Sequence, residues 1–95
     1  MFLGKYDYEG DPVELLAAYD RVMAGMPADS LIFHICIQRD GGITVYDACP
    51  SAEVFASFSS SPEVLGAMTA AGLPTPVVTQ LGESHRAMAA AAYVQ

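Results

Sequence analysis

The feature that most constrains the fold of this chain is an apolar hairpin at residues 31–49, LIFHICIQRDGGITVYDAC. Both of its arms are rich in β-branched and aromatic residues, which favour strands. Between the arms, Asp40-Gly41 is typical of a type I′ turn, in which both central residues have positive φ. One arm nevertheless carries a histidine, His34, and the other an aspartate, Asp47. The hairpin therefore predicts a core sheet that contains two titratable side chains.

The position of the turn decides which side chains of the hairpin face each other. If the Asp-Gly pair is central, His34 lies directly opposite Asp47, where Cβ atoms are about 4.5–5.5 Å apart and the side chains can hydrogen-bond. If the turn is centred one residue later, His34 faces Cys49 and Asp47 becomes a diagonal neighbour. Neither register puts Cys36 opposite Cys49, so a disulfide between them is disfavoured.

Strand alternation divides the hairpin into two faces, because successive side chains point to opposite sides of a sheet. The smoother face carries Leu31, Phe33, Ile35, Ile37, Thr44, Tyr46 and Ala48. The mixed face carries Ile32, His34, Cys36, Gln38, Ile43, Val45, Asp47 and Cys49. We expect the helices to pack on the smoother face, and the mixed face to form a cavity wall or the lumen of a dimer.

The helices are indicated by their ends. Asp11, followed directly by proline, is a good N-cap for a first helix that stops at Gly25. Ser51 caps a short helix, AEVFASF, and Ser61 caps another that ends at Gly72 in a Schellman-type stop. These two short helices occupy the place of one broken helix.

The order of elements is β-α-β-β-α-β, which is the ferredoxin-like arrangement of an α+β fold. Four antiparallel strands would be covered by helices on one face only, which leaves the other face bare. The predicted strands are residues 2–9, 31–38, 43–49 and 75–84. We expect a single domain over residues 1–95, with residues 85–95 as a tail that is helical, swapped onto a partner or mobile.

The composition favours a second copy of the chain as the partner. With 95 residues and 53% hydrophobic residues, the chain has more apolar material than a small monomer hides easily. A net charge of −7 disfavours nucleic acid. There is no apolar run long enough for a membrane span, and the first residues do not read as a secretory signal, so a cytoplasmic homodimer is expected. The two cysteines lack metal-ligand spacing, and no metal or other cofactor is expected.

Two stretches, GGITVYDACPSAEVFASF and GLPTPVVTQL, resemble the dimeric α+β barrel superfamily, the relatives of antibiotic biosynthesis monooxygenases. The shared pattern covers most of the chain, to about Ser84. It consists of an aspartate that ends a strand, a Ser-x-Glu-x-Phe helix start and a Gly-Leu-Pro before the last strand. Here these are Asp47, Ser51, Glu53, Phe55, Gly72, Leu73 and Pro74.

The resemblance implies a dimer in which two four-stranded sheets face each other, with the helices outside. It also implies a ligand pocket between the sheet and the helices or in the barrel lumen. The chain departs from the pattern at Cys49, where relatives often have tryptophan, and it contains neither tryptophan nor asparagine. These absences argue against haem oxygenation and weaken the case for quinone-forming monooxygenation.

The residues themselves point to one chemistry. An aspartate bonded to one imidazole nitrogen fixes the tautomer and makes the other nitrogen a better proton acceptor. His34 and Asp47 could therefore act as a general base on an acidic phenol or enol. Tyr6 on the neighbouring strand could donate to an oxyanion, and Cys36 and Cys49 are candidate substrate contacts.

Three functions remain open on this basis. The first is a cofactor-independent monooxygenase-like or cyclase-like enzyme that acts on a hydrophobic aromatic metabolite. The second is a non-catalytic small-molecule binding or sensing module. The third is a purely structural homodimer in which His34 and Asp47 satisfy each other in the core.

Overall fold

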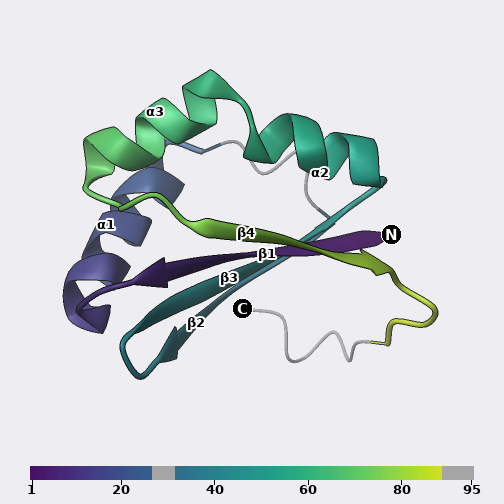
Figure 1. The fold of residues 1–95 in the computed structure, drawn as a ribbon, viewed down its shortest axis with the longest axis horizontal. Coiled ribbons are helices and arrows are strands. Elements are labelled where there is room, and N and C mark those ends of the chain that lie inside the picture. Colours follow the sequence, from purple (N-terminus) through teal and green to yellow (C-terminus); the bar gives the residue numbers. More distant parts are fainter. Residues whose placement is uncertain (27–31, 89–95) are drawn as a thin grey trace.

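The computed structural model describes residues 1–26 and 32–88. The predicted order of elements is confirmed, with the second helix divided in two (Figure 1). The elements are β1 (Phe2–Glu9), α1 (Pro12–Ala24), β2 (Phe33–Arg39), β3 (Gly42–Cys49), α2 (Ala52–Ser59), α3 (Pro62–Ala71) and β4 (Val77–Glu83). Residues 84–88 follow β4 without forming a helix or strand, and the rest of the predicted tail lies outside the described residues.

The predicted caps fix the ends of the helices. The Asp11 carboxylate accepts the Glu14 backbone N–H at 3.2 Å at the start of α1, and the Ser51 hydroxyl accepts the Val54 N–H at 3.2 Å at the start of α2. Gly72 closes α3 in the left-handed conformation with φ 100°, which an L side chain adopts only with strain. No described helix is long and apolar enough to cross a membrane.

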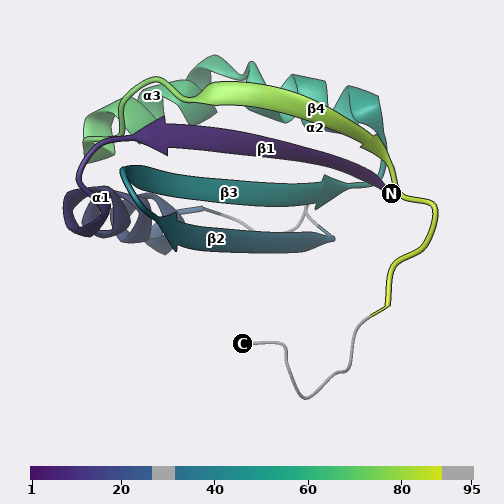
Figure 2. The ribbon, with the colours of Figure 1, turned by 60° about the horizontal axis from the view of Figure 1, so that its bottom comes forward.

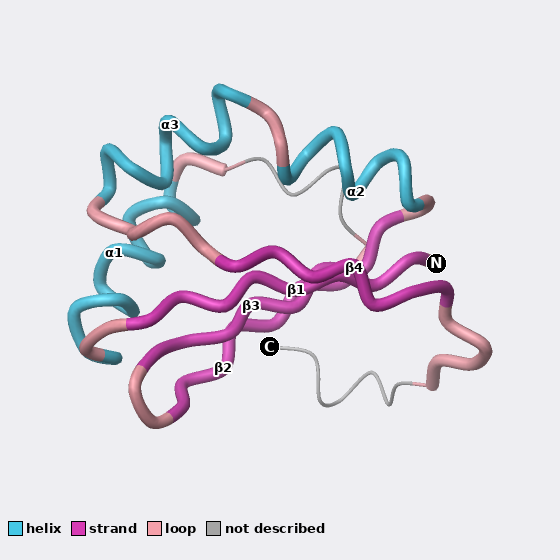
Figure 3. Tube along the Cα trace, in the orientation of Figure 1, coloured by secondary structure: helices cyan, strands magenta, loops and turns pink. Residues whose placement is uncertain are grey.

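The sheet is antiparallel with strand order β2-β3-β1-β4, so β3 and β1 are central and β2 and β4 are edges. All three helices lie on one side of it (Figures 1 and 2). The trace in Figure 3 follows β1 and β4 side by side, although they stand near opposite ends of the chain. The register between β1 and β4 shifts between Leu3 and Gly4.

The hairpin has the first of the two registers considered above, because Arg39 pairs with Gly42 and the Asp-Gly pair is central. The predicted type I′ turn is wrong. Gly41 has a φ of 77°, but no described residue other than glycine has a positive φ, so Asp40 does not. These signs are those of a type II turn, which needs positive φ only at its second central residue. The Gly41 carbonyl accepts the Gly10 N–H at 2.9 Å, which ties the turn to the residue that follows β1.

The predicted orientation of the hairpin is also wrong, because the helices cover the mixed face that holds His34. On the face predicted to receive them, Phe33, Ile35 and Ile37 are 44%, 39% and 43% exposed. The rest of this open face on the hairpin is Thr44, Tyr46 and Ala48. Leu31, which strand alternation places on the same face, lies outside the described residues.

The central strands explain the reversal. The large side chains Tyr6 and Tyr8 of β1 are buried on the same face as Val45 and Ile43 of β3, with which they pair. The isoleucines that favoured the other face belong to β2, which is an edge strand. The bulk of the two central strands therefore decides which face the helices cover.

Phe55 of α2 anchors the helix layer against β1. It is fully buried and lies against Phe2 and Tyr6, with ring centroids 5.8 and 5.6 Å apart. The Phe55 ring also lies directly over Gly4, where an added Cβ would overlap it. The absence of a side chain at Gly4 therefore lets α2 approach the sheet closely.

Candidate functional site

His34 and Asp47 are hydrogen-bonded across the hairpin, as expected for the first of the two registers. They are direct partners in the register of β2 and β3, and His34 Nδ1 lies 2.5 Å from Asp47 Oδ1. Asp47 is 2% exposed because it lies on a central strand beneath the helices, whereas His34 on the edge strand is half-buried. A carboxylate with so little access to water is stabilised by its bond to the imidazole.

Tyr19 of α1 extends this pair into a chain of three groups. Its hydroxyl oxygen lies 2.5 Å from His34 Nε2, and its ring stacks on the imidazole with centroids 5.7 Å apart and planes at 12°. Burial, with smaller contributions from Cys36 and Asp47, raises the pKa of Tyr19 to about 12, so the phenol is protonated at neutral pH. When His34 is neutral, Tyr19 donates to Nε2 and Nδ1–H donates to Asp47, which is the one tautomer that serves both contacts.

A narrow cavity adjoins this chain, between the sheet and the helices. Its volume is about 30 Å³, which is enough for a water molecule but not for an aromatic ring, since benzene occupies a cavity of about 150 Å³. Its walls are formed by Tyr6, Tyr8, Tyr19, Val22, Met23, Met26, His34, Val45, Asp47, Phe58, Met68 and Leu73. Most of these side chains are apolar, and the polar groups come from tyrosines and from the His34–Asp47 pair.

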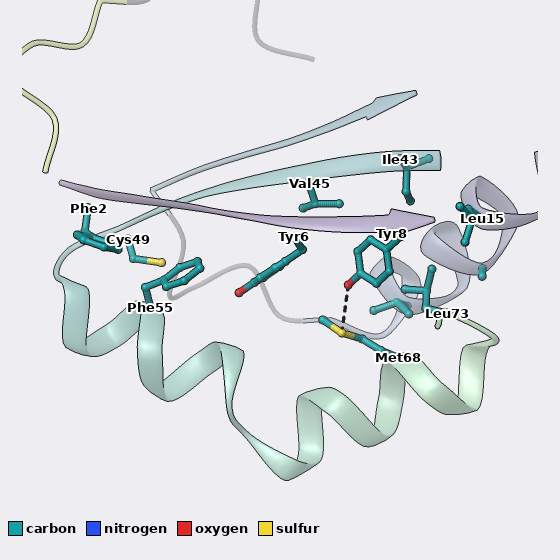
Figure 4. Close-up of a cluster of buried hydrophobic side chains, with 12 residues drawn as sticks. Phe2, Tyr6, Tyr8, Leu15, Ile43, Val45, Cys49, Phe55, Met68 and Leu73 are labelled. Carbon is teal, nitrogen blue, oxygen red and sulfur yellow. Dashed lines mark hydrogen bonds between the residues drawn. The ribbon is translucent and has the colours of Figure 1, made fainter. Parts of the chain in front are cut away.

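The Tyr6 side chain lines the cavity and carries a buried hydroxyl. The residue is 2% exposed, and within residues 1–26 and 32–88 its hydroxyl has no hydrogen-bond partner. In Figure 4 this hydroxyl points away from the sheet, into the space between Phe55 and Met68. Burial, followed by the charge of Asp47, raises the pKa of Tyr6 well above its usual value, so the group is a proton donor at neutral pH. The neighbouring Tyr8 hydroxyl instead donates to Met68 Sδ at 3.3 Å.

Cys36 and Cys49 do not line this cavity. Both thiols are free, and burial raises the pKa of each, which keeps them in the unreactive protonated form. Cys49 is fully buried beside Phe55 (Figure 4). The role of the two cysteines as substrate contacts stays a prediction. The part of the chain that the structure describes holds no group of three metal-ligating side chains.

Tyr19 is the residue of this site that the sequence did not reveal. Its helical spacing places it in the apolar stripe of α1 with Leu15 and Val22, where a tyrosine ring is ordinary core material. The signal that could have found it is its polar tip, since a buried tyrosine hydroxyl usually has a partner. Only the packing of α1 against the edge strand identifies that partner as His34.

Comparisons with known proteins bear on the fold. The sequence matches no protein-family model, and no curated protein matches it significantly. A crystal structure from Deinococcus radiodurans, described as a candidate antibiotic biosynthesis monooxygenase, is similar with a TM-score of 0.59 at 12% identity over 94% of this chain and 100% of that one. SnoaB, a cofactor-independent oxygenase from Streptomyces nogalater solved as a point mutant, is similar with a TM-score of 0.55 at 17% identity over 92% of each chain.

These similarities extend over nearly the whole chain, so they concern the complete sheet and its helices rather than one motif. They agree with the resemblance stated from the Asp47 and Gly-Leu-Pro motifs. The chain therefore has the βαββααβ ferredoxin-like fold of the antibiotic biosynthesis monooxygenase-like structures, to which it is distantly similar.

Proposed function

We propose that the protein is a cofactor-independent enzyme that removes a proton from an apolar aromatic molecule with an acidic hydroxyl, a phenol or an enol. The observation that carries the proposal is the hydrogen-bonded chain of Tyr19, His34 and Asp47 on the wall of an apolar cavity. The anion left by this step is electron-rich, so it can react with dioxygen or cyclise. The distant similarity to an oxygenase described as cofactor-independent supports this class of reaction.

The arrangement suits proton removal for an electrostatic reason. Asp47 is buried and fixed at 2.5 Å from Nδ1. Its negative charge therefore stabilises the positive charge that His34 gains when Nε2 takes up a proton. The geometry is present before a ligand arrives, which avoids reorganisation during the reaction. Asp47 acts in this scheme through His34 and does not itself become protonated.

Binding requires the cavity to widen, because about 30 Å³ is too little for an aromatic ring. Three methionines, Met23, Met26 and Met68, line it. Methionine has three rotatable bonds and adapts to irregular shapes, so rotation of these side chains can enlarge the space. We therefore expect an aromatic ligand to enter by displacing methionine side chains while the polar chain stays in place.

The open face of the sheet is proposed to bind a second copy of the chain. It exposes the apolar side chains of Phe33, Ile35, Ile37 and, on β4, Val77. Beside them lie two ion pairs, Lys5 with Asp7 at 3.2 Å and Arg39 with Glu9 at 2.9 Å. A face that carries both signs of charge around an apolar strip can complement itself across a two-fold axis.

The proposed activity can be tested with 4-hydroxyacetophenone, a phenol whose absorbance reports its ionisation. Bound to the protein, the probe is expected to ionise at a lower pH than in water, and His34→Ala should abolish this shift. The matched control is His85→Ala, which changes the other histidine, an exposed residue after β4. A shift that survives in His34→Ala would contradict the proposal.

A second candidate function is non-catalytic binding of the same kind of molecule. It is favoured by one observation, that Tyr19, His34 and Asp47 already satisfy one another without a ligand. In the same titration, this alternative predicts binding of 4-hydroxyacetophenone with no change in its ionisation.

A further inference from the structure

We propose that Tyr19, rather than His34, receives the proton of the ligand, and that the Tyr6 hydroxyl holds a second oxygen of the same ligand. The inference rests on the proposed function and deepens it, because it defines the ligand. The molecule must carry a hydroxyl that donates to Tyr19 and a separate oxygen that accepts from Tyr6. A phenol or enol that also bears a carbonyl has this combination.

The hydrogen-bonding capacity of Tyr19 sets the first requirement on the ligand. His34 Nε2 is already occupied, because the Tyr19 hydroxyl lies 2.5 Å from it. A phenol has one proton to donate and two lone pairs that accept. The donor capacity of Tyr19 is spent on His34, so the hydroxyl can only accept from a ligand. The ligand must therefore be a donor at this position, as an acidic hydroxyl is.

The Tyr6 hydroxyl sets the second requirement on the ligand. The side chain of Tyr6 lines the cavity, and its buried hydroxyl lacks a hydrogen-bond partner throughout the residues that the structure describes. Leaving a buried polar group unpaired costs about 1–3 kcal/mol, which the chain could avoid by having phenylalanine there. The neighbouring Tyr8 is paired with Met68, so the unpaired state of Tyr6 is not common to the tyrosines of this strand.

The proton transfer follows from this arrangement. The O–H bond of the ligand breaks and leaves its electron pair on the ligand oxygen, while the proton passes to the Tyr19 oxygen. The original Tyr19 O–H bond breaks at the same time, and that proton passes to His34 Nε2. The ligand becomes an anion, His34 becomes an imidazolium held by Asp47, and Tyr19 ends as a neutral phenol. The Tyr6 O–H donates to the second oxygen, over which the negative charge of the anion is delocalised.

Three probes of nearly equal size separate the two contacts. 4-Hydroxyacetophenone has both a hydroxyl donor and a carbonyl acceptor, 4-ethylphenol has only the hydroxyl group, and 4-methoxyacetophenone has no hydroxyl to donate. Affinity is measured by calorimetry, and ionisation of the bound phenols by absorbance. The variants are Tyr6→Phe and Tyr19→Phe, with Tyr46→Phe on the open face as the matched control.

Tyr6→Phe is expected to weaken both ketones about tenfold, the value of one hydrogen bond, and to leave 4-ethylphenol unchanged. Tyr19→Phe is expected to abolish ionisation of bound 4-hydroxyacetophenone while 4-methoxyacetophenone binds as before. Equal losses for all three probes would indicate a structural role and overturn the inference. If bound 4-hydroxyacetophenone still ionises in Tyr19→Phe, the proton acceptor is His34. That result would overturn this inference and leave the proposed function standing.

A measurement on the unmodified protein covers the case in which Tyr19→Phe does not fold. The Nδ1–H proton of His34 gives a downfield resonance in the proton NMR spectrum, and its position reports on the charge of the ring. Addition of 4-hydroxyacetophenone should shift it, and 4-methoxyacetophenone should not. Identical responses to both ketones would overturn the inference. If 4-hydroxyacetophenone binds to the unmodified protein without ionising, the proposed function itself fails.

Discussion

The two faces of the sheet treat polar side chains in different ways. On the covered face, Asp47 is 2% exposed and its partner His34 is itself held by Tyr19. On the open face, Asp7 accepts the Thr44 hydroxyl at 2.6 Å and also lies near two cations, but water reaches it. The same strands, β2 and β3, therefore contribute His34 and Asp47 to a buried polar chain on one side, and Arg39 and Thr44 to a hydrated ionic network on the other.

The two faces differ in the free energy that is lost when a hydrogen bond between polar side chains is broken. A buried group left without its partner bears the full cost of desolvation, whereas an exposed group recovers hydrogen bonds to water. The polar side chains of the covered face are therefore held in one geometry. Those of the open face can rearrange until another protein surface covers them.

The largest effect is expected from a charge on the open face. Ile35→Lys places an ammonium group in the middle of the apolar strip, and Ile35 is 39% exposed. Because burial of an unpaired charge is costly, light scattering should give the mass of one chain where the unmodified protein gives two. Val13→Lys, at a 71% exposed site on α1, is the control that should leave the mass unchanged. A monomeric unmodified protein would remove the proposed dimer altogether.

Gly4→Ala tests how tightly the covered face is packed. The added methyl group would overlap the Phe55 ring, so α2 must shift or the ring must leave its position between Phe2 and Tyr6. We expect the free energy of unfolding to fall by about 1–3 kcal/mol, as in other overpacked cores. It is measured by urea denaturation.

The control for Gly4 is Gly66→Ala, because Gly66 lies within α3 and nothing surrounds its missing Cβ. There the change should raise the free energy of unfolding by about 0.5–1 kcal/mol, since alanine is the better helix former. Destabilisation at both sites would mean that the effect at Gly4 does not come from Phe55.

Removing one carboxylate from each face compares their polar groups directly. Asp47→Ala leaves the His34 Nδ1–H without its acceptor and should lower the free energy of unfolding by about 1–3 kcal/mol. Asp7→Ala should cost less than about 1 kcal/mol, because its partners on the open face are partly hydrated. Both are compared by denaturation in the Ile35→Lys background, where the open face stays in water. Equal costs would contradict the distinction between the faces.

The smallest effect is a dependence on pH that belongs to the open face. The hydrogen bond from Thr44, helped by Lys5 and Arg39, holds the pKa of Asp7 below its usual value. A carboxyl with a lowered pKa stabilises the fold above the pKa of the unfolded chain, about 3.9. That stability is lost as the pH falls through the lower pKa of the folded state. Unfolding measured between neutral and acidic pH should therefore depend less on pH in Asp7→Asn than in the unmodified chain.

The sequence predicted more of the local structure than of the packing. The caps at Asp11 and Ser51 depend on residues near one another in the chain, and both are confirmed. The pairing of His34 with Asp47 is equally local, and the structure has it in one of the two registers that the turn allowed. The face that the helices cover depends on which strands are central. That order depends on contacts between distant segments, so alternation within the hairpin could not reveal it.

The candidate site shows the same division. His34 and Asp47 were found because one turn sets their register, whereas Tyr19 approaches His34 only when α1 packs on the sheet. The turn type was wrong because glycine at the second central position suits both type I′ and type II turns, which differ in the sign of φ at Asp40.

Hydrogen bonds toward the two edges of the sheet join residues with very different separations in the chain, and this has a consequence for folding. His34 and Asp47 are 13 positions apart, whereas Met1 and Ser84, which meet where β1 lies beside β4, are 83 apart. Short loops close at a lower entropic cost and therefore earlier. We expect changes in the β2–β3 hairpin to slow refolding, and changes along β4 mainly to accelerate unfolding, in stopped-flow experiments. The polar pair would then form before the core that later shields it from water.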